Sequence, residues 1–242
     1  FLIKIADYIF SYRDIKLYNE VIGQIKETHF DVILCASYYI FPLLCAKRIS
    51  RRLSVPLCID LRDIMEQNAK PKGWENFTQF FKLRWLNQGR RNRILSSANI
   101  VTTVSPWHVQ TIMKHHDDVR LIYNGFDSEK FCFSPIPTEK FTITYTGRLL
   151  ENSLRNPTLF FESITELCSD KKFKGNLLIQ WYVDKASIEQ IKGMTEQYGL
   201  TGQTKISSTV SSCLMPEILN KSSIVLVISN KSTDNGPHGI MT

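Results

Sequence analysis

The sequence predicts an α/β protein with two Rossmann-like domains, each built on a parallel sheet. Short continuous apolar runs alternate with helix-like segments, a pattern typical of parallel strands buried on both faces. This alternation stops at a proline-rich stretch, 134–140, and then starts again. The chain has 242 residues, of which 43% are hydrophobic and 22% charged, enough for two cores of ordinary size.

The first half has four apolar runs that predict strands, each preceded or followed by a helix-like segment. The strands are expected over 31–36, 55–60, 99–104 and 119–123. The helices are expected over 15–27, up to Arg51-Arg52, over 74–97 and from 106 onward. Ser105 and Pro106 mark the start of the last helix, because a hydroxyl at the N-cap and a proline at the first helical position are both favoured there.

The second half repeats the pattern. Strands are expected over 141–146, 176–183, 203–206 and 223–228, and helices over 157–168, 185–198 and 213–220. We therefore predict a first domain over 1–134, a linker over 135–140 and a second domain over 141–242. Open α/β sheets bind ligands beyond the carboxyl ends of their strands, so a cleft between the domains is the expected binding site.

Positive charge gathers in the first half. Residues 1–134 hold 19 Lys and Arg against 13 Asp and Glu, whereas residues 135–242 hold 11 against 10. This bias indicates an anionic partner, and nucleic acid is disfavoured because no nucleic-acid-binding module accompanies the charge. One stretch interleaves aromatics and cations, which suits either an anionic membrane or the core face of a helix. It comprises Trp74, Phe77, Phe80, Phe81, Lys82, Arg84, Trp85, Arg90, Arg91 and Arg93.

The cysteines and apolar runs indicate a cytoplasmic protein. Cys35, Cys45 and Cys58 lie in apolar runs and the six cysteines show no CxxC spacing, so buried reduced thiols are expected rather than disulfides or a metal site. The longest apolar run, 32–46, is shorter than the ~20 residues that span a bilayer. The pairs His115-His116 and Asp117-Asp118 are not expected to bind a metal, because adjacent side chains on a helix do not face one another.

The segment after the strand over 141–146 carries the most specific signal. Gly147 permits close backbone approach, Arg148 and Arg155 flank a polar loop, and Asn156 caps the following helix. Arginine holds phosphate oxygens bidentately, and the positive end of a helix dipole attracts anions. These residues predict a phosphate or diphosphate site. The alternative is that both arginines are solvated loop residues.

Other candidate residues follow strands in the same way. Asp60, Arg62 and Asp63 come at the end of the strand over 55–60 and can orient sugar hydroxyls or an acceptor phosphate, or can form a self-paired surface loop. Ser105 either faces donor phosphates or only caps its helix. Gly236, His238 and Gly239 form a polar loop that is suited to a transferred sugar, or His238 is an ordinary loop histidine.

The order of these motifs resembles a known family. "CIDLRD", "ANIVTTVSPWHVQTIM", "VRLIYNGFDSEKF" and "FTITYTGRLLENSLRNPTLFFESITEL" together are similar to a family 4 glycosyltransferase of the GT-B fold. The resemblance covers residues ~31 to 242. It implies a retaining enzyme that uses a nucleoside diphosphate sugar, with the Gly147-Arg148 pair on the donor diphosphate and Asp60, Arg62 and Asp63 on the acceptor side. No cofactor beyond the donor and no metal are implied.

Two departures from the family pattern shape the expectation. Many members place a lysine about five residues after the Gly-Arg arginine, and here Arg155 of "RNP" supplies the second charge. The acidic motif with two glutamates and the first glycine-rich loop are absent, so this stretch is expected to be a fragment that is inactive alone.

The resemblance implies a glycan or lipid-linked acceptor, a role in surface polysaccharide synthesis, and a cytoplasmic protein in peripheral contact with the inner face of the cell membrane. The alternatives are a non-catalytic GT-B-like scaffold that keeps the nucleotide pocket and a GT-B sugar-nucleotide epimerase.

Overall fold

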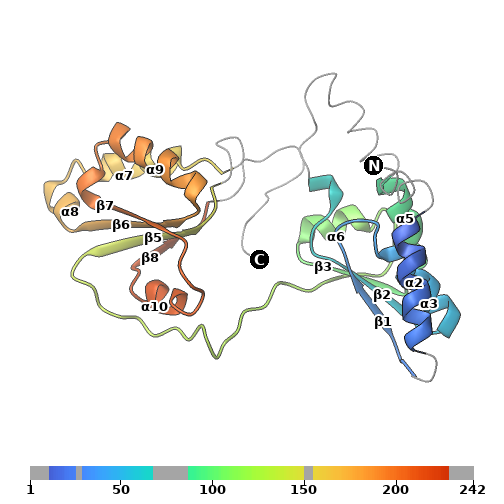
Figure 1. Cartoon of the computed structure of the whole chain (residues 1–242). Coiled ribbons are helices and arrows are strands. Elements are labelled where there is room, and N and C mark those ends of the chain that lie inside the picture. Colours follow the sequence, from blue (N-terminus) through green and yellow to red (C-terminus); the bar gives the residue numbers. More distant parts are fainter. Residues whose placement is uncertain (1–10, 26–28, 68–86, 150–154, 229–242) are drawn as a thin grey trace, which may run out of the picture. The chain divides into compact units, whose positions relative to one another are not determined.

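A computed structural model describes residues 11–25, 29–67, 87–149 and 155–228. The chain divides into two compact units, which we call unit 1 (Phe1–Asn124) and unit 2 (Gly125–Met241). Each unit holds one parallel sheet of four described strands with helices packed against it (Figure 1). The α/β class with two parallel-sheet units, predicted from the sequence, is therefore confirmed.

In unit 1 the strands follow one another across the sheet in the order β1-β2-β3-β4, all parallel. Its strands are β1 (Ile33–Ala36), β2 (Leu57–Leu61), β3 (Ile100–Thr103) and β4 (Val119–Leu121). Its helices are α2 (Tyr12–Gln24), α3 (Leu43–Leu53), α5 (Gly89–Leu95) and α6 (Pro106–Ile112), with a 3₁₀ turn, η1 (Met65–Gln67).

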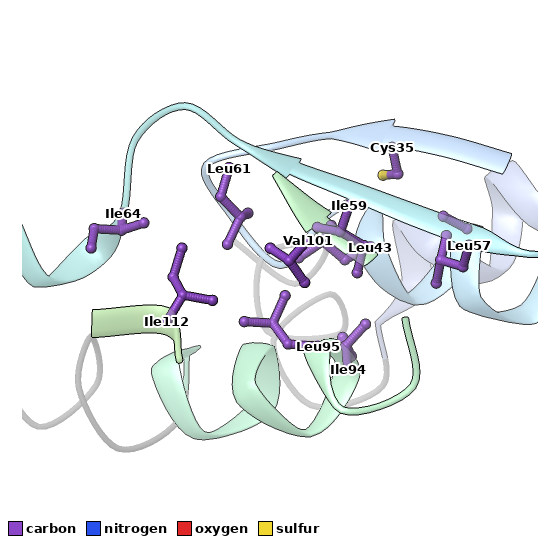
Figure 2. Close-up of a cluster of buried hydrophobic side chains, with 11 residues drawn as sticks. Cys35, Leu43, Leu57, Ile59, Leu61, Ile64, Ile94, Leu95, Val101 and Ile112 are labelled. Carbon is purple, nitrogen blue, oxygen red and sulfur yellow. The ribbon is translucent and has the colours of Figure 1, made fainter. Parts of the chain in front are cut away.

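The core of unit 1 lies on one face of this sheet. Leu57, Ile59 and Leu61 alternate along β2 and are completely buried. Figure 2 shows them packed with Val101 of β3 and with side chains from the connecting helices, among them Leu43, Ile94, Leu95 and Ile112. Right-handed crossovers between sequential parallel strands place all their helices on the same face, which explains why α3, α5 and α6 share one core.

In unit 2 the strand order is β7-β6-β5-β8, again all parallel. The strands are β5 (Phe141–Gly147), β6 (Leu177–Val183), β7 (Thr204–Ser208) and β8 (Ile224–Leu226). The helices are α7 (Thr158–Leu167), α8 (Lys171–Gly175), α9 (Lys185–Gln197) and α10 (Met215–Asn220), with a 3₁₀ turn, η4 (Thr201–Gln203).

The chain reverses its winding direction within the sheet of unit 2. It runs outward from β5 to β6 and β7, and then returns to pair β8 with the other side of β5. Figure 1 accordingly shows α7 and α9 on one side of the sheet and α10 on the other. The boundary between β5 and β8 is thus a topological switch point, where open α/β sheets bind their ligands.

Aromatic packing dominates the core of unit 2. Trp181 of β6 is fully buried, and its ring stacks on that of Phe161 from α7, with centroids 5.7 Å apart. The Tyr145 ring of β5 lies 5.1 Å from the same indole. Such contacts add to the hydrophobic stabilisation of burial and fix α7 on the sheet directly beside the end of β5.

Local sequence signals hold at several positions. The Ser105 Oγ accepts a hydrogen bond from the His108 amide at 3.2 Å, as expected of an N-cap before Pro106. Cys35 and Cys45 are buried, as predicted, and Cys58 is only half-buried. Helix α8 was not predicted; it begins where the Asp170 carboxylate accepts from the Lys172 amide at 2.8 Å.

The division between the units falls ahead of the predicted domain end at residue 134. Within the predicted linker, Ile136 donates its amide to the Asn220 carbonyl at 2.8 Å, and the Ser134 amide bonds the Asn220 side chain at 3.1 Å. Residues 134–136 are therefore held against α10 of unit 2.

One residue of the proposed cationic stripe is not on the surface. The Arg91 guanidinium is completely buried and donates to both carboxylate oxygens of Glu66, at 2.8 and 2.5 Å. The hypothesis that Arg91 contributes to a membrane-facing stripe is therefore wrong, because its charge is neutralised inside unit 1. Arg93 is exposed and Arg90 is half-buried, and positions 74–85 of the stripe lie outside the described residues.

Candidate functional site

The predicted diphosphate site begins at the carboxyl end of β5, one of the two strands that flank the switch point of unit 2. Gly147 ends β5 with a φ of +134°, a backbone conformation that favours glycine. An added Cβ would meet the Tyr145 hydroxyl at 3.7 Å and its Cζ at 4.0 Å, both ordinary contacts, so the requirement for glycine here is conformational rather than steric. The turn carries the chain directly from the strand into Arg148.

The Arg155 side chain reaches the backbone of Arg148 after this turn. The Arg155 Nη1 donates to the Arg148 carbonyl oxygen at 3.0 Å, and the Tyr145 hydroxyl donates to the same oxygen at 3.0 Å. These two bonds fix the Arg148 backbone and bring the second guanidinium beside it. The structure therefore unites Gly147, Arg148 and Arg155, which the sequence placed together only as a hypothesis.

A carboxylate that the phosphate prediction did not include lies in the same place. Arg148 donates its Nε–H to the Asp184 Oδ2 at 3.2 Å, and the Arg148 side chain is 69% exposed. Asp184 follows β6, and its other oxygen accepts from the Ser187 amide at 3.3 Å, which caps α9. The Asp-x-x-Ser spacing before a predicted helix was a signal that could have identified this cap.

The neighbours of Asp184 stabilise its ionised carboxylate. The Ser187 hydroxyl donates to the carboxylate, and this bond, together with the Arg148 guanidinium, lowers the pKa of Asp184 below its usual value. Asp184 is thus an anion at neutral pH. It occupies the Nε edge of the Arg148 guanidinium.

Asn156 lies directly before Pro157, the N-cap residue of α7, which makes no side-chain capping bond of its own. The Asn156 Oδ1 accepts from the Thr158 amide at 2.9 Å and from the Thr158 hydroxyl at 2.6 Å, at the start of α7. This satisfies one of the amides that a helix N-terminus leaves without an intrahelical partner. The positive end of the α7 dipole and two guanidinium groups together favour an anion at this end of the sheet.

In unit 1 the predicted acidic loop also forms a hydrogen-bonded group. Asp60 pairs with the Arg62 Nε at 3.2 Å and accepts from the Thr102 hydroxyl at 2.7 Å. Arg62 reaches on to the Asn124 Oδ1 at 3.2 Å. Thr102 lies on β3 and Asn124 follows β4, so both are distant in sequence from Asp60 and Arg62. The sequence analysis therefore did not include them.

The remaining predicted residues have different outcomes. Asp63 lies exposed in the bend after β2, and Ser105 is occupied as a helix cap. Gly236, His238 and Gly239 lie outside the described residues.

The buried side chain of His108 lies within hydrogen-bond distance of Thr103, at the carboxyl ends of β2 and β3. The Thr103 hydroxyl donates to the Leu61 carbonyl at 2.7 Å and lies 3.1 Å from the His108 Nδ1. Because a hydroxyl has a single proton, the His108 Nδ1 must donate to Thr103. This assigns the tautomer and ties the start of α6 to the strand that carries Asp60.

A cavity in the described part of the chain lies apart from these residues. This cavity, of about 540 Å³, opens beside α10, but its walls include Lys140 and Thr142 at the amino end of β5, away from Gly147. No three His, Cys, Asp or Glu side chains of the described residues are grouped to hold a metal ion. None of the helices in the described ranges is both long and apolar enough to span a bilayer.

The two parallel-sheet units define the GT-B class of fold, and solved glycosyltransferase structures share it. The sequence profile of Glycosyltransferase Family 4 matches residues 3–130, more than half of the chain. The chain therefore belongs to this family. No protein among the curated sequences compared with it matches.

Solved structures with this fold are distant in sequence. The lipopolysaccharide outer core galactosyltransferase WaaB has a TM-score of 0.61 at 12% identity, over 92% of this chain and 56% of its own. Sucrose-phosphate synthase from Thermosynechococcus elongatus has a TM-score of 0.57 at 11% identity, over 87% and 53%. Anabaena HepE in complex with UDP-glucose has a TM-score of 0.54 at 16% identity, over 86% and 55%. The chain thus spans about half the length of the structures that it matches.

Proposed function

We propose that the intact protein transfers a glycosyl group, with retention, from a nucleoside diphosphate sugar to a hydroxyl of a glycan or glycolipid. The observation that carries this proposal is the hydrogen bond that brings the Arg155 guanidinium to the Arg148 backbone at the carboxyl end of β5, in a chain that belongs to a glycosyltransferase family. A solved structure of the same fold, HepE, holds UDP-glucose, which supports a donor of this class.

The proposed chemistry needs charge stabilisation more than acid–base groups. The bond between the anomeric carbon and the diphosphate oxygen breaks, the acceptor oxygen forms the new bond to that carbon, and the acceptor's hydroxyl proton passes to the departing diphosphate. Negative charge develops on the leaving diphosphate, where the Arg148 and Arg155 guanidinium groups and the start of α7 are placed to stabilise it. In this proposal the protein uses neither a metal nor a cofactor beyond the donor.

The residues of unit 1 would serve the acceptor. Asp60 and Arg62, with Asp63 beside them, present a carboxylate and a guanidinium already oriented by Thr102 and Asn124. Such groups can hold sugar hydroxyls by charge-assisted hydrogen bonds. Ser105, Gly236, His238 and Gly239 remain candidates for contacts with the donor.

We place the reaction in surface polysaccharide synthesis in the cytoplasm. A lipid-linked acceptor would bring the protein to the inner face of the membrane as a peripheral partner. Free buried thiols at Cys35 and Cys45 suit a reducing compartment.

Calorimetric titration with UDP, GDP and ADP tests the donor site. We expect one of them to bind, and Arg148→Ala and Arg155→Ala each to weaken binding by roughly 1.5–3 kcal/mol, or about ten- to a hundredfold, because a charged phosphate contact is lost. Lys172→Ala, an exposed cation on α8, is the matched control and should bind like the wild type. Equal affinity in all four proteins would refute the site.

Catalysis and binding are separated by a second measurement. With the donor sugar that matches the bound nucleotide, a transferase releases nucleoside diphosphate as acceptor is added. A non-catalytic scaffold would bind the nucleotide and release none.

A further inference from the structure

Two adjacent tyrosines, Tyr38 and Tyr39, follow the carboxyl end of β1 in unit 1. We call them the tyrosine pair. Their rings are arranged edge to face, with centroids 4.5 Å apart and planes inclined by 79°. This arrangement uses the face of only one of the two rings, and Tyr39 is 60% exposed. The pair therefore presents aromatic surface to a ligand.

The segment that carries the tyrosine pair is fixed by its neighbours. The Ser37 Oγ lies 2.8 Å from the carbonyl oxygen of Tyr39 and 2.8 Å from that of Phe41. The Arg13 guanidinium of α2 lies over the Phe41 ring, 4.7 Å from its centroid. Because the segment is already ordered, a ligand that binds it does not have to order it.

The tyrosine pair leaves the sheet beside the polar group at the end of β2. Strands β1 and β2 are parallel neighbours, and their register pairs Ala36 with Asp60. Just beyond this point, the Ser37 amide donates to the Asp60 carbonyl oxygen at 3.1 Å. The two strands thus bring an aromatic pair and the ion pair of Asp60 and Arg62 to the same edge of the sheet.

The ion pair can make further hydrogen bonds. The Asp60 carboxylate accepts one bond from Thr102 and one from Arg62, whereas its two oxygens can together accept about four. Arg62 donates its Nε proton to Asp60 and an Nη1 proton to Asn124, and its side chain is 68% exposed. A guanidinium has five N–H donors, so others are accessible to a ligand.

A sugar in its pyranose form matches both kinds of surface. The C–H groups on one side of the ring form an apolar face, which is attracted to the electron-rich face of an aromatic ring. The hydroxyls around the ring can donate to a carboxylate and accept from a guanidinium. An acyclic polyol has the same hydroxyls but no rigid apolar face.

We propose that the tyrosine pair, with Asp60 and Arg62, forms a subsite for one pyranose ring. The ring lies on the exposed tyrosine, and its hydroxyls bond to the carboxylate and the guanidinium. The identification of this ring as the terminal sugar of the acceptor rests on the proposed function. The subsite then makes the group that receives the glycosyl unit a sugar hydroxyl.

Saturation-transfer NMR tests the subsite with methyl glucopyranoside, methyl galactopyranoside and methyl mannopyranoside as probes. We expect at least one of them to bind the wild-type protein, with saturation reaching the C–H protons of one ring face most strongly. Sorbitol, an acyclic polyol, should show no binding. The absence of any pyranoside signal, or an equal signal from sorbitol, would overturn the proposal.

Three substitutions test the two parts of the subsite. Tyr39→Ala removes the exposed ring and should weaken pyranoside binding about tenfold, whereas Tyr39→Phe keeps the ring and should bind like the wild type. Asp60→Asn can still accept from Thr102 but loses its charge, and it should also weaken binding about tenfold. A loss in Tyr39→Phe equal to that in Tyr39→Ala, or unchanged binding in Asp60→Asn, would contradict the joint subsite.

The matched control removes an exposed aromatic ring from unit 2. Phe133 is 89% exposed, and Phe133→Ala should bind the pyranosides like the wild type. A loss as large as that in Tyr39→Ala would attribute the binding to exposed aromatic surface in general and overturn the proposal.

Nucleotide titration separates this proposal from the proposed function. Tyr39→Ala should bind the nucleoside diphosphate as the wild type does, which also shows that the variant is folded. Pyranoside binding without nucleotide binding would refute the donor site and leave the pyranose subsite standing. Nucleotide binding without pyranoside binding would overturn the subsite and leave the donor site standing.

Discussion

At the scale of single residues, burial separates three arginines that all contact carboxylates. The Arg91 side chain is 1% exposed, whereas those of Arg62 and Arg148 are 68% and 69% exposed. A buried pair cannot exchange its partner without leaving a charge in the interior. An exposed pair contributes little to stability and can exchange its carboxylate for a phosphate or a sugar hydroxyl. Arg91 is therefore structural, and Arg62 and Arg148 are available to ligands.

Removing the buried guanidinium should be costly. We expect Arg91→Met to lower the free energy of unfolding by about 3 kcal/mol, because the Glu66 carboxylate is left without its partner. Urea denaturation measures this change. The double variant Arg91→Met/Glu66→Met should recover part of the loss, and the exposed Arg93→Met should change stability by less than about 0.5 kcal/mol. A double variant as unstable as the single one would contradict this reasoning.

The same pair predicts a pH dependence. Burial alone would raise the pKa of Glu66, but the hydrogen bond and charge of Arg91 outweigh it and hold the pKa below its ordinary value of 4.5. The folded state then binds fewer protons than the unfolded state, so the stability from the pair is fully present above about pH 4.5 and is lost as the pH falls through the lowered pKa.

Urea midpoints between about pH 6 and about pH 3.5 measure this loss. The urea midpoint of Glu66→Gln should fall less steeply over this pH interval than that of the wild type. The exposed Glu162→Gln should follow the wild-type curve, and an unchanged slope in Glu66→Gln would assign the acid sensitivity to other carboxylates.

At the scale of elements, the candidate sites form where parallel strands end and helices begin. Asp184 serves two elements, since it caps α9 and holds the guanidinium that follows β5. A diphosphate bound to Arg148 would compete with this carboxylate. The cap and the competition are chemically separable, because an amide oxygen can cap a helix but carries no charge.

Two substitutions at Asp184 distinguish the roles. Asp184→Asn should keep the urea midpoint close to that of the wild type and tighten nucleoside diphosphate binding a few fold, because Arg148 loses its competing anion. Asp184→Ala should tighten binding similarly but lower the midpoint, because the cap is lost. Weaker binding in Asp184→Asn would mean that the carboxylate assists the ligand.

At the scale of the whole molecule, each unit has a core of its own. Among the residues that the structure describes, eleven buried ones form the main cluster around the sheet of unit 1, and another eleven form that of unit 2. Separate cores allow separate unfolding transitions. A ligand held by unit 2 alone stabilises only that unit.

Calorimetry of two matched core variants tests this independence. Ile59→Ala in β2 and Ile179→Ala in β6 each truncate a buried isoleucine in a strand with a neighbour on both sides. Each should destabilise its own unit by about 3 kcal/mol. Each should therefore lower the midpoint temperature of only one unfolding transition. Saturating nucleoside diphosphate should raise the midpoint temperature of the transition whose midpoint Ile179→Ala lowers. A single transition that responds to both substitutions would show that the units unfold together.

The sequence by itself predicted most of the elements and the two-unit organisation, because apolar periodicity, caps and turn residues act over a few neighbouring positions. The order of its motifs indicated the family. Ser105, Asn156 and Gly147 have the local roles that their residue types predict. Only the tertiary structure decided which charges are paired. Glu66 and Arg91 are separated by 25 positions, and Arg148 and Asp184 by 36. Charge pairing depends on distance and burial after folding, and neither quantity can be read from the spacing of residues along the chain.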